Sequence, residues 1–256
     1  MTETITAEVA EYPVSWETLP ADFELPDDPV ENLEHPTLVA GLTEAIDAAG
    51  LITESILIAS NFGICVRVGG RVVVKAPDWV YIANAKPLPS GENRRSYTPH
   101  AEGDVPAVVM EFLSDRDNGE YSYRPNPPYG KWWFYEKIVK VPKYVIFDPA
   151  CGRLEVYQLK SEHYSPQVPD ANGLYWIPGI DLFLGVWEGT KGQRSGYWLR
   201  WWDREGNILP WWSEKSVQDR QRADAAERRA ALLLERLRRA GVSEEELGEI
   251  EQNNLS

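Results

Sequence analysis

The chain has 256 residues, 43% of them hydrophobic, and a formal net charge of −14. This length fits one large domain or one domain with appendages, and the hydrophobic content excludes global disorder. The two cysteines exclude a disulfide framework, the N-terminus lacks the pattern of a signal peptide, and no apolar run reaches the roughly 18 residues of a membrane span. We therefore expect a cytoplasmic protein that does not bind membranes.

Charge is unevenly distributed along the chain. Residues 1–66 contain no lysine or arginine, whereas basic residues concentrate in 116–143 and 191–239. The negative net charge argues against tight, general binding of nucleic acid, because proteins of that class usually carry a basic patch or stripe. A local basic face on an acidic protein is still compatible with weak, locally steered binding.

The first half of the chain predicts an arm, a helix and a hairpin. Residues 1–30 are acidic and rich in proline, which predicts an extended N-terminal arm. Apolar residues at helical spacing predict a helix over residues 35–49. Two runs rich in β-branched residues follow at 55–68 and 69–83, and the Gly69-Gly70 pair between them predicts a β-hairpin.

The middle of the chain alternates between strands, loops and one helix. We expect a polar loop at 84–105, a strand at 106–114, a second loop at 115–130 and a helix at 131–141. Two strands paired as a hairpin are expected at 143–149 and 151–159. Helices and strands in this order predict a mixed α/β fold with one central sheet.

The C-terminal third changes character twice. Residues 164–212 are dense in tryptophan and glycine, which favours short strands joined by tight turns. From Ser213 to Ala240 a long charged helix is expected, with an apolar heptad seam at Ala223, Ala226, Ala230, Leu233, Leu237 and Ala240. Gly241 ends this helix, and the capping box from Ser243 to Glu246 predicts a short final helix.

Two acids at strand ends carry the chemistry that the sequence suggests. Asp78 follows Pro77 and precedes an apolar run, and Glu111 interrupts the apolar run of the strand at 106–114. An ionised acid beside a core loses hydration unless something pairs with it. Two such acids on neighbouring strands are a common protein contribution to a Mg²⁺ site. Alone, Asp78 also fits a turn aspartate, and Glu111 also fits an exposed edge position or a structural salt bridge.

Lys131, at the start of the expected helix, would complete a site for phosphodiester hydrolysis, although alone it also fits a solvated lysine. A divalent ion held by Asp78 and Glu111 would bind the phosphate and lower the pKa of an attacking water. The lysine ammonium would stabilise the developing charge or orient the nucleophile. Spacing does not decide which further acid would join the metal shell: Glu34, Glu44 or Glu120.

Other residue groups give weaker signals. The three histidines show no ligand spacing, and for His35 a helix-capping role is favoured over chemistry. The sequence contains no phosphate-binding glycine loop. The tryptophans between 198 and 212 could stack on bases or sugars, but packing within a β-rich segment is the favoured interpretation.

These segments together resemble a known family. The order Pro-Asp, then Val-Val-Met-Glu-Phe-Leu-Ser, then Lys131-x-x-x-Tyr135 and Val-Pro-Lys-Tyr-Val-Ile-Phe-Asp-Pro is similar to that of a widespread bacterial family of putative restriction endonucleases. That family belongs to the PD-(D/E)XK nuclease superfamily. The resemblance covers about residues 30 to 160, and its most specific part is the block from Lys131 to Pro149.

The resemblance implies an α/β, restriction-endonuclease-like fold, in which a mixed central sheet is flanked by helices, with Asp78 and Glu111 as metal ligands. The superfamily's lysine normally stands two residues after the acid, where this chain has Leu113, so Lys131 would have to reach the site from its helix; Lys137 is a poorer candidate. The implied organisation is an acidic arm at 1–30, a nuclease-like core at 31–160, a Trp-rich β extension packed on it at 161–212, and a helical segment at 213–256.

Two functional hypotheses follow. The first is a Mg²⁺-dependent endonuclease that hydrolyses phosphodiester bonds of DNA, with Asp78, Glu111 and Lys131 as catalytic residues and a homodimer as the expected state. The alternative is a non-catalytic interaction protein, in which a degenerate nuclease core supports the C-terminal helix for dimerisation or partner binding. Target sequence and a preference for DNA over RNA do not follow from the residues.

Overall fold

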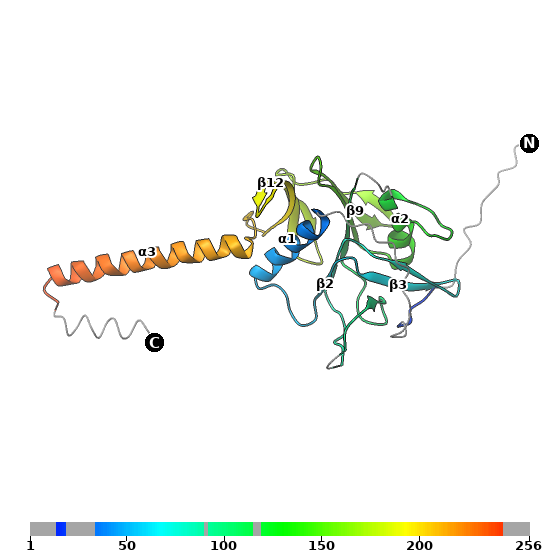
Figure 1. Ribbon diagram of the computed structural model, residues 1–256, viewed down its shortest axis with the longest axis horizontal. Helices are drawn as coiled ribbons and strands as arrows, with labels where there is room; N and C mark the ends of the chain where they lie inside the picture. The colour runs from blue at the N-terminus through cyan, green and yellow to red at the C-terminus, as the bar shows by residue number, and fades with distance from the viewer. Residues whose placement is uncertain (1–13, 19–33, 90–91, 115–118, 243–256) are drawn as a thin grey trace, which may run out of the picture. The chain divides into compact units, whose positions relative to one another are not determined.

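The computed structural model describes residues 14–18, 34–89, 92–114 and 119–242 (Figure 1). The chain divides into two compact units, Met1–Leu209 and Pro210–Ser256. The first unit is the mixed α/β fold that the sequence predicts, with a central sheet and strands in the Trp-rich segment, but it also contains a further sheet that the sequence does not predict. Among its helices and that of the second unit, as far as they are described, none is both long and apolar enough to cross a membrane.

A six-stranded mixed sheet forms the centre of the first unit. Its strands follow the order β10-β9-β8-β7-β5-β2. Their bounds are Leu57–Ala59 for β2, Trp79–Ile82 for β5, Val108–Phe112 for β7, Lys143–Asp148 for β8, Arg153–Lys160 for β9 and His163–Pro166 for β10. Strands β7 and β8 are parallel, and the other neighbours are antiparallel. Continuous apolar runs suit β5, β7 and β8 because these strands lie inside the sheet and are buried on both faces.

The parallel pair β7 and β8 requires a crossover connection, and the segment between them supplies it. It contains a 3₁₀ turn, η1 (Gly119–Tyr121), one turn of α-helix, α2 (Lys131–Trp133), and a π-helical segment, η2 (Phe134–Val139). The helix expected over 131–141 is therefore present but mostly π-helical. Lys140, in the left-handed conformation with φ 59°, ends it.

A second sheet contains β1 (Val14–Ser15), β3 (Gly63–Val68), β4 (Arg71–Lys75) and β6 (Ser96–Tyr97). The predicted hairpin is confirmed: β3 and β4 are antiparallel, and Gly69 and Gly70 between them have φ values of 55° and 79°. The runs at 55–68 and 69–83 are each divided, because β2 and β5 join the central sheet while β3 and β4 form this one.

The Trp-rich segment forms a third sheet with β11 (Tyr175–Ile177), β12 (Leu182–Lys191) and β13 (Arg194–Trp202). Strands β12 and β13 are longer than expected and turn at Gly192, whose φ is 61°. In Figure 1 the helix α1 (Glu34–Ala48), predicted at 35–49, lies beside this hairpin. The indole nitrogen of Trp201 donates to the carbonyl oxygen of Leu42 at 3.1 Å. Packing is thus confirmed for Trp198 and Trp201, which are fully buried.

The two faces of the central sheet bury different partners. On one face, Trp79 of β5 donates to the hydroxyl of Thr43 in α1 at 3.0 Å. On the other face, Val80, Val109 and Ile146 pack in one hydrophobic cluster with Phe134 and Tyr135 of η2. Because side chains alternate along a strand, Glu111 projects to the same face as Val109, toward η2.

The second unit contains the helix α3 (Trp212–Arg239), which confirms the helix predicted from Ser213 to Ala240. None of its side chains is buried. Gly241, with φ 89°, follows its end. The predicted final helix and its capping box from Ser243 lie outside the described residues, as does the N-terminal arm apart from residues 14–18.

Candidate active site

The register of β5 and β7 brings Asp78 next to Glu111. Trp79 pairs with Met110 in this antiparallel ladder, so the preceding residue, Asp78, lies beside Glu111 at the strand ends. The backbone N–H of Phe112 donates to Oδ2 of Asp78 at 2.6 Å. This hydrogen bond fixes the Asp78 carboxylate against the end of β7, where a charged group needs a donor.

Glu111 is fully buried within β7. Its Oε2 accepts a hydrogen bond from Nζ of Lys131 at 2.9 Å, and its Oε1 accepts one from the hydroxyl of Tyr135 at 3.1 Å. Burial raises the pKa of Glu111 to about 8, because desolvation outweighs the attraction of Lys131, and the neighbouring Asp78 raises it further. The site therefore holds a carboxylate that is costly to ionise without a cation beside it.

Lys131 lies between two buried carboxylates. Its Nζ is 2.9 Å from Oε2 of Glu111 and 3.3 Å from Oε1 of Glu120, and its side chain is 25% exposed. Burial lowers the pKa of Lys131, but the negative charges of Glu111, Glu120 and Asp78 outweigh this and raise it above its usual value. A charged ammonium thus contacts Glu111 and Glu120 at once.

Among the three acids that the sequence left open, Glu120 is the one that contacts Lys131. Glu44 of α1 instead pairs with Lys191 at 2.6 Å, and Glu34 lies 3.7 Å from Arg194. Glu120 is buried in η1, and the Tyr144 hydroxyl donates to its backbone oxygen at 2.8 Å. No local sequence pattern distinguishes Glu120, because its position depends on how the loop packs.

Close packing of two backbone segments holds Glu120 near Lys131. Gly130 directly precedes α2, and a Cβ added there would collide with the backbone oxygen of Ser122. The N–H of Gly130 also donates to the carbonyl oxygen of Arg124 at 2.9 Å. Only glycine allows this approach, so Gly130 lets the turn that carries Glu120 lie against the start of the lysine-bearing helix.

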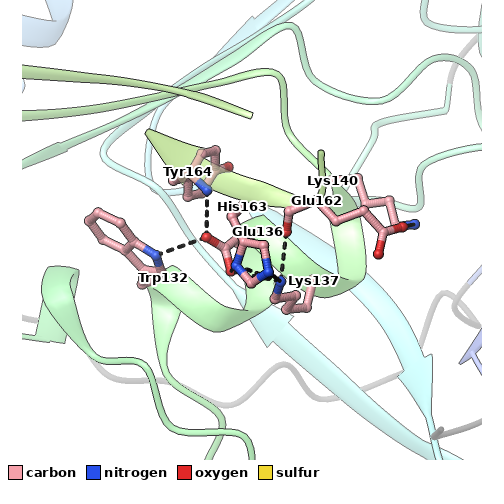
Figure 2. Close-up of polar contacts among 7 residues, drawn as sticks. All are labelled: Trp132, Glu136, Lys137, Lys140, Glu162, His163 and Tyr164. Atoms are coloured by element: carbon pink, nitrogen blue, oxygen red, sulfur yellow. Dashed lines mark hydrogen bonds and ion pairs between the residues drawn. The ribbon is translucent and has the colours of Figure 1, made fainter. Parts of the chain in front are cut away.

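A second polar cluster holds η2, which continues the helix that begins at Lys131 (Figure 2). Oε1 of the buried Glu136 accepts from the backbone N–H of Tyr164 at 2.6 Å and from the indole of Trp132 at 3.4 Å. Nζ of Lys137 donates to the backbone oxygen of Glu162 at 2.6 Å and lies 3.3 Å from Oε2 of Glu136. These contacts tie η2 to the β9–β10 turn, and η2 carries Tyr135 to Glu111.

The contacts in this cluster distinguish the two candidate lysines, Lys131 and Lys137. Lys137 contacts Glu136, Glu162 and both ring nitrogens of His163, at 3.1 and 3.3 Å, whereas Lys131 contacts Glu111. Leu113, where the superfamily normally has its lysine, donates its N–H to the carbonyl oxygen of Phe147 at 2.8 Å and packs against the hydrophobic core. The structure therefore brings Lys131, and not Lys137, to the acid pair.

His35 lies closer to the acids than the sequence suggested. Its Nδ1 is 3.7 Å from Oδ1 of Asp78, and its ring packs edge-on against Phe112, with the centroids 5.6 Å apart. Burial lowers the pKa of His35, but the interaction with Asp78 outweighs this and leaves the pKa above its usual value. His35 therefore faces the acid site, as well as lying at the start of α1.

The donor set of the site consists of carboxylate oxygens. Within the described part of the chain, no three histidine, cysteine, aspartate or glutamate side chains form a group that could hold a metal ion by themselves. Mg²⁺ is usually bound through only one or two carboxylates, with water and substrate phosphates filling the other positions. The pair Asp78 and Glu111, in which Oε2 of Glu111 already faces the ammonium of Lys131, fits that kind of ion.

A mixed α/β unit built around a mixed central sheet is consistent with a restriction-endonuclease-like fold. The chain belongs to the putative restriction endonuclease family Uma2, whose family model matches residues 24–187. The resemblance seen in the sequence is therefore confirmed, and the match extends into the Trp-rich sheet. No curated protein matches the chain.

Proposed function

We propose that this protein is a Mg²⁺-dependent endonuclease that hydrolyses phosphodiester bonds of DNA, with Asp78 and Glu111 as metal ligands and Lys131 as the catalytic lysine. The observation that carries the proposal is the convergence of these three side chains from separate elements. Membership of a restriction endonuclease family supports the reaction class. We also propose the four-segment organisation given above and a cytoplasmic location.

Phosphodiester hydrolysis builds negative charge on the phosphoryl oxygens and on the leaving oxygen. An ion bound to Asp78 and Glu111 would neutralise part of that charge and lower the pKa of the attacking water. The Lys131 ammonium, held 2.9 Å from Glu111, is placed to stabilise the same charge or to orient the water. Glu111 would have to be ionised to hold a cation, so metal binding at this residue would be coupled to release of its proton.

The surrounding residues hold these groups in position. The N–H of Phe112 orients Asp78, and the hydroxyl of Tyr135 orients Glu111. Glu120, 3.3 Å from Lys131, gives the ammonium a second acceptor beside Glu111. A rigid arrangement of this kind lowers the reorganisation needed during reaction.

A plasmid assay tests the proposal. Purified protein is incubated with supercoiled DNA in Mg²⁺ or Mn²⁺, beside Asp78→Asn and Glu111→Gln. The expected result is metal-dependent nicking by the wild type and loss of nicking in both variants. Nicking that persisted in both would identify a contaminating nuclease, and no nicking by any sample would contradict the proposal.

A second candidate function rests on the exposed apolar residues of α3. Leu233, a member of the heptad seam, is 52% exposed, and no residue of the described part of this helix is buried. Val217 and Leu232, 55% and 60% exposed, lie outside the seam. An interaction protein, homodimeric through a coiled coil, would use this seam. Truncation before Ser213 would then lower the oligomeric state measured by sedimentation, while full-length protein would leave plasmid DNA intact.

A further inference from the structure

Helix α3 is a basic element in an acidic chain. Between Trp212 and Arg239 it has eight basic and five acidic residues, whereas the whole chain has a net charge of −14. All of these side chains lie on a helix without buried residues, so their charges face solvent. The distribution of the charges around the helix decides what they can bind.

Four of the basic residues form one column. Lys215, Arg222, Arg229 and Arg236 recur every seven residues, which keeps them on one side of the helix with a drift of about 20° per repeat. Successive members are roughly 10 Å apart, and the whole column is roughly 30 Å long. We call these four residues the basic column.

Two of the five acids of α3, Asp224 and Glu235, lie three or four residues from members of the other set of four basic residues. Arg239 pairs with Glu235, and Arg228 lies four residues after Asp224. In contrast, Arg229 and Arg236 have no acid three or four residues away in the sequence. Asp219 neighbours two members of the column: it lies four residues after Lys215 and 3.6 Å from Arg222, where exposures of 55% and 78% make the pair weak.

A second copy of α3 would not neutralise the basic column. In a parallel pair built on the heptad seam, each column residue faces the residue five positions later on the other helix. Arg222 would then face Glu227, but Lys215 would face Arg220 and Arg229 would face Leu234. An antiparallel pair would bring the two columns together. The column therefore suits a polyanion better than a second copy.

We propose that the basic column binds the phosphate backbone of duplex DNA. The identity of the polyanion rests on the proposed function, since DNA is the substrate of that reaction. Binding would release condensed counterions, so the affinity would fall steeply with salt, by about 0.9 log unit per log unit of salt for each phosphate neutralised. The column would also explain how an acidic protein engages DNA through one local surface.

Two variants of the full chain with the same net charge test this proposal. The first replaces the column: Lys215→Gln, Arg222→Gln, Arg229→Gln and Arg236→Gln. The matched control replaces the other four basic residues of α3: Arg220→Gln, Arg228→Gln, Arg238→Gln and Arg239→Gln. Glutamine is a good helix former, and circular dichroism verifies that the helix is retained in both.

The measurement is the fluorescence anisotropy of a labelled 30-base-pair duplex across a salt series in EDTA. Because no divalent ion is present, the result does not depend on whether the site cleaves DNA. The column variant is expected to lose at least tenfold in affinity, and its slope of log affinity against log salt concentration should be smaller in magnitude by about three. The affinity of the control should stay within about threefold of the wild type. Equal losses in both variants, or no loss in the column variant, would overturn the proposal. So would a column variant that changes its sedimentation but not its DNA affinity.

Discussion

Nζ of Lys131 lies 2.9 Å from Oε2 of Glu111, although 20 residues separate them in the chain. The carboxylate comes from a buried strand and the ammonium from the start of a short helix on one face of the sheet. Removing the ammonium would leave Glu111 buried without a charged partner, which is costly.

Replacing Lys131 should remove catalysis. In Lys131→Met the ammonium is lost, and we expect single-turnover DNA cleavage to fall by about 10²- to 10³-fold, the usual cost of losing one charge-stabilising donor. Lys140→Met is the matched control, because Lys140 pairs with the exposed Glu162. This variant should cleave DNA at the wild-type rate. Equal rates in the two variants would assign the reaction to another cation.

Glu111 should make stability depend on pH. Its pKa of about 8 in the folded protein is above the value near 4.3 of an exposed glutamate, so the folded state binds this proton more tightly than the unfolded state. The stability that the bound proton of Glu111 contributes is fully present below about pH 4 and is lost as the pH rises through 8. The free energy of unfolding should therefore fall by a few kcal/mol over that range.

Glu111→Gln should flatten this dependence, because its amide does not titrate. Glu162→Gln, at an exposed side chain, should retain the wild-type slope. Chemical denaturation at pH 5, 6.5 and 8 measures the free energy for all three proteins. If the wild type gained stability toward pH 8 relative to Glu111→Gln, Glu111 would be ionised throughout.

Glu136 should position the lysine-bearing helix. Glu136→Ala leaves the N–H of Tyr164 without the acceptor that it has at 2.6 Å, which costs about 1–3 kcal/mol of stability. We expect cleavage to fall as well, because η2 also carries Tyr135 to Glu111. Glu136→Gln keeps an acceptor oxygen and should restore most of both losses. An alanine variant with lower stability but wild-type cleavage would show that this anchor does not position the site.

The two cysteines should differ in reactivity. Cys65 is buried in β3, and burial raises the pKa of its thiol to about 11, whereas Cys151 is exposed in the turn between β8 and β9. The reactive species is the thiolate, so a thiol reagent at pH 8 should label Cys151 alone in the folded protein and both after denaturation. Labelling of native Cys151→Ser at a wild-type rate would contradict the burial of Cys65.

The strand ends could be read from the sequence because apolar runs and the acids that interrupt them are local signals. Asp78 and Glu111 were found in this way, and the helix that begins at Lys131 supplied the lysine. Glu120 could not be chosen, since its place depends on Gly130 packing against Ser122. Tyr135 was seen only as part of a family pattern, and its hydrogen bond to Glu111 depends on the π-helical geometry of η2.

The sheets were less predictable than the strands. The sequence at 55–68 reads as one continuous run, but the chain changes direction at Asn61, whose φ is 45°, and β2 and β3 belong to different sheets. Propensity does not encode that division, because both halves are equally suited to strands. For His35 the sequence favours a capping role for a similar reason, because only the fold brings its Nδ1 to within 3.7 Å of Oδ1 of Asp78.

The most direct test of the acid pair as a metal site is the Mg²⁺ dependence of single-turnover cleavage of a labelled duplex. Wild type, Asp78→Asn and Glu111→Gln are compared with Glu44→Gln, whose carboxylate pairs with Lys191 instead. We predict saturable Mg²⁺ dependence for the wild type and Glu44→Gln, and rates at least about 10²-fold lower for the two site variants at every Mg²⁺ concentration. Wild-type rates and an unchanged Mg²⁺ dependence in Asp78→Asn and Glu111→Gln would contradict the account.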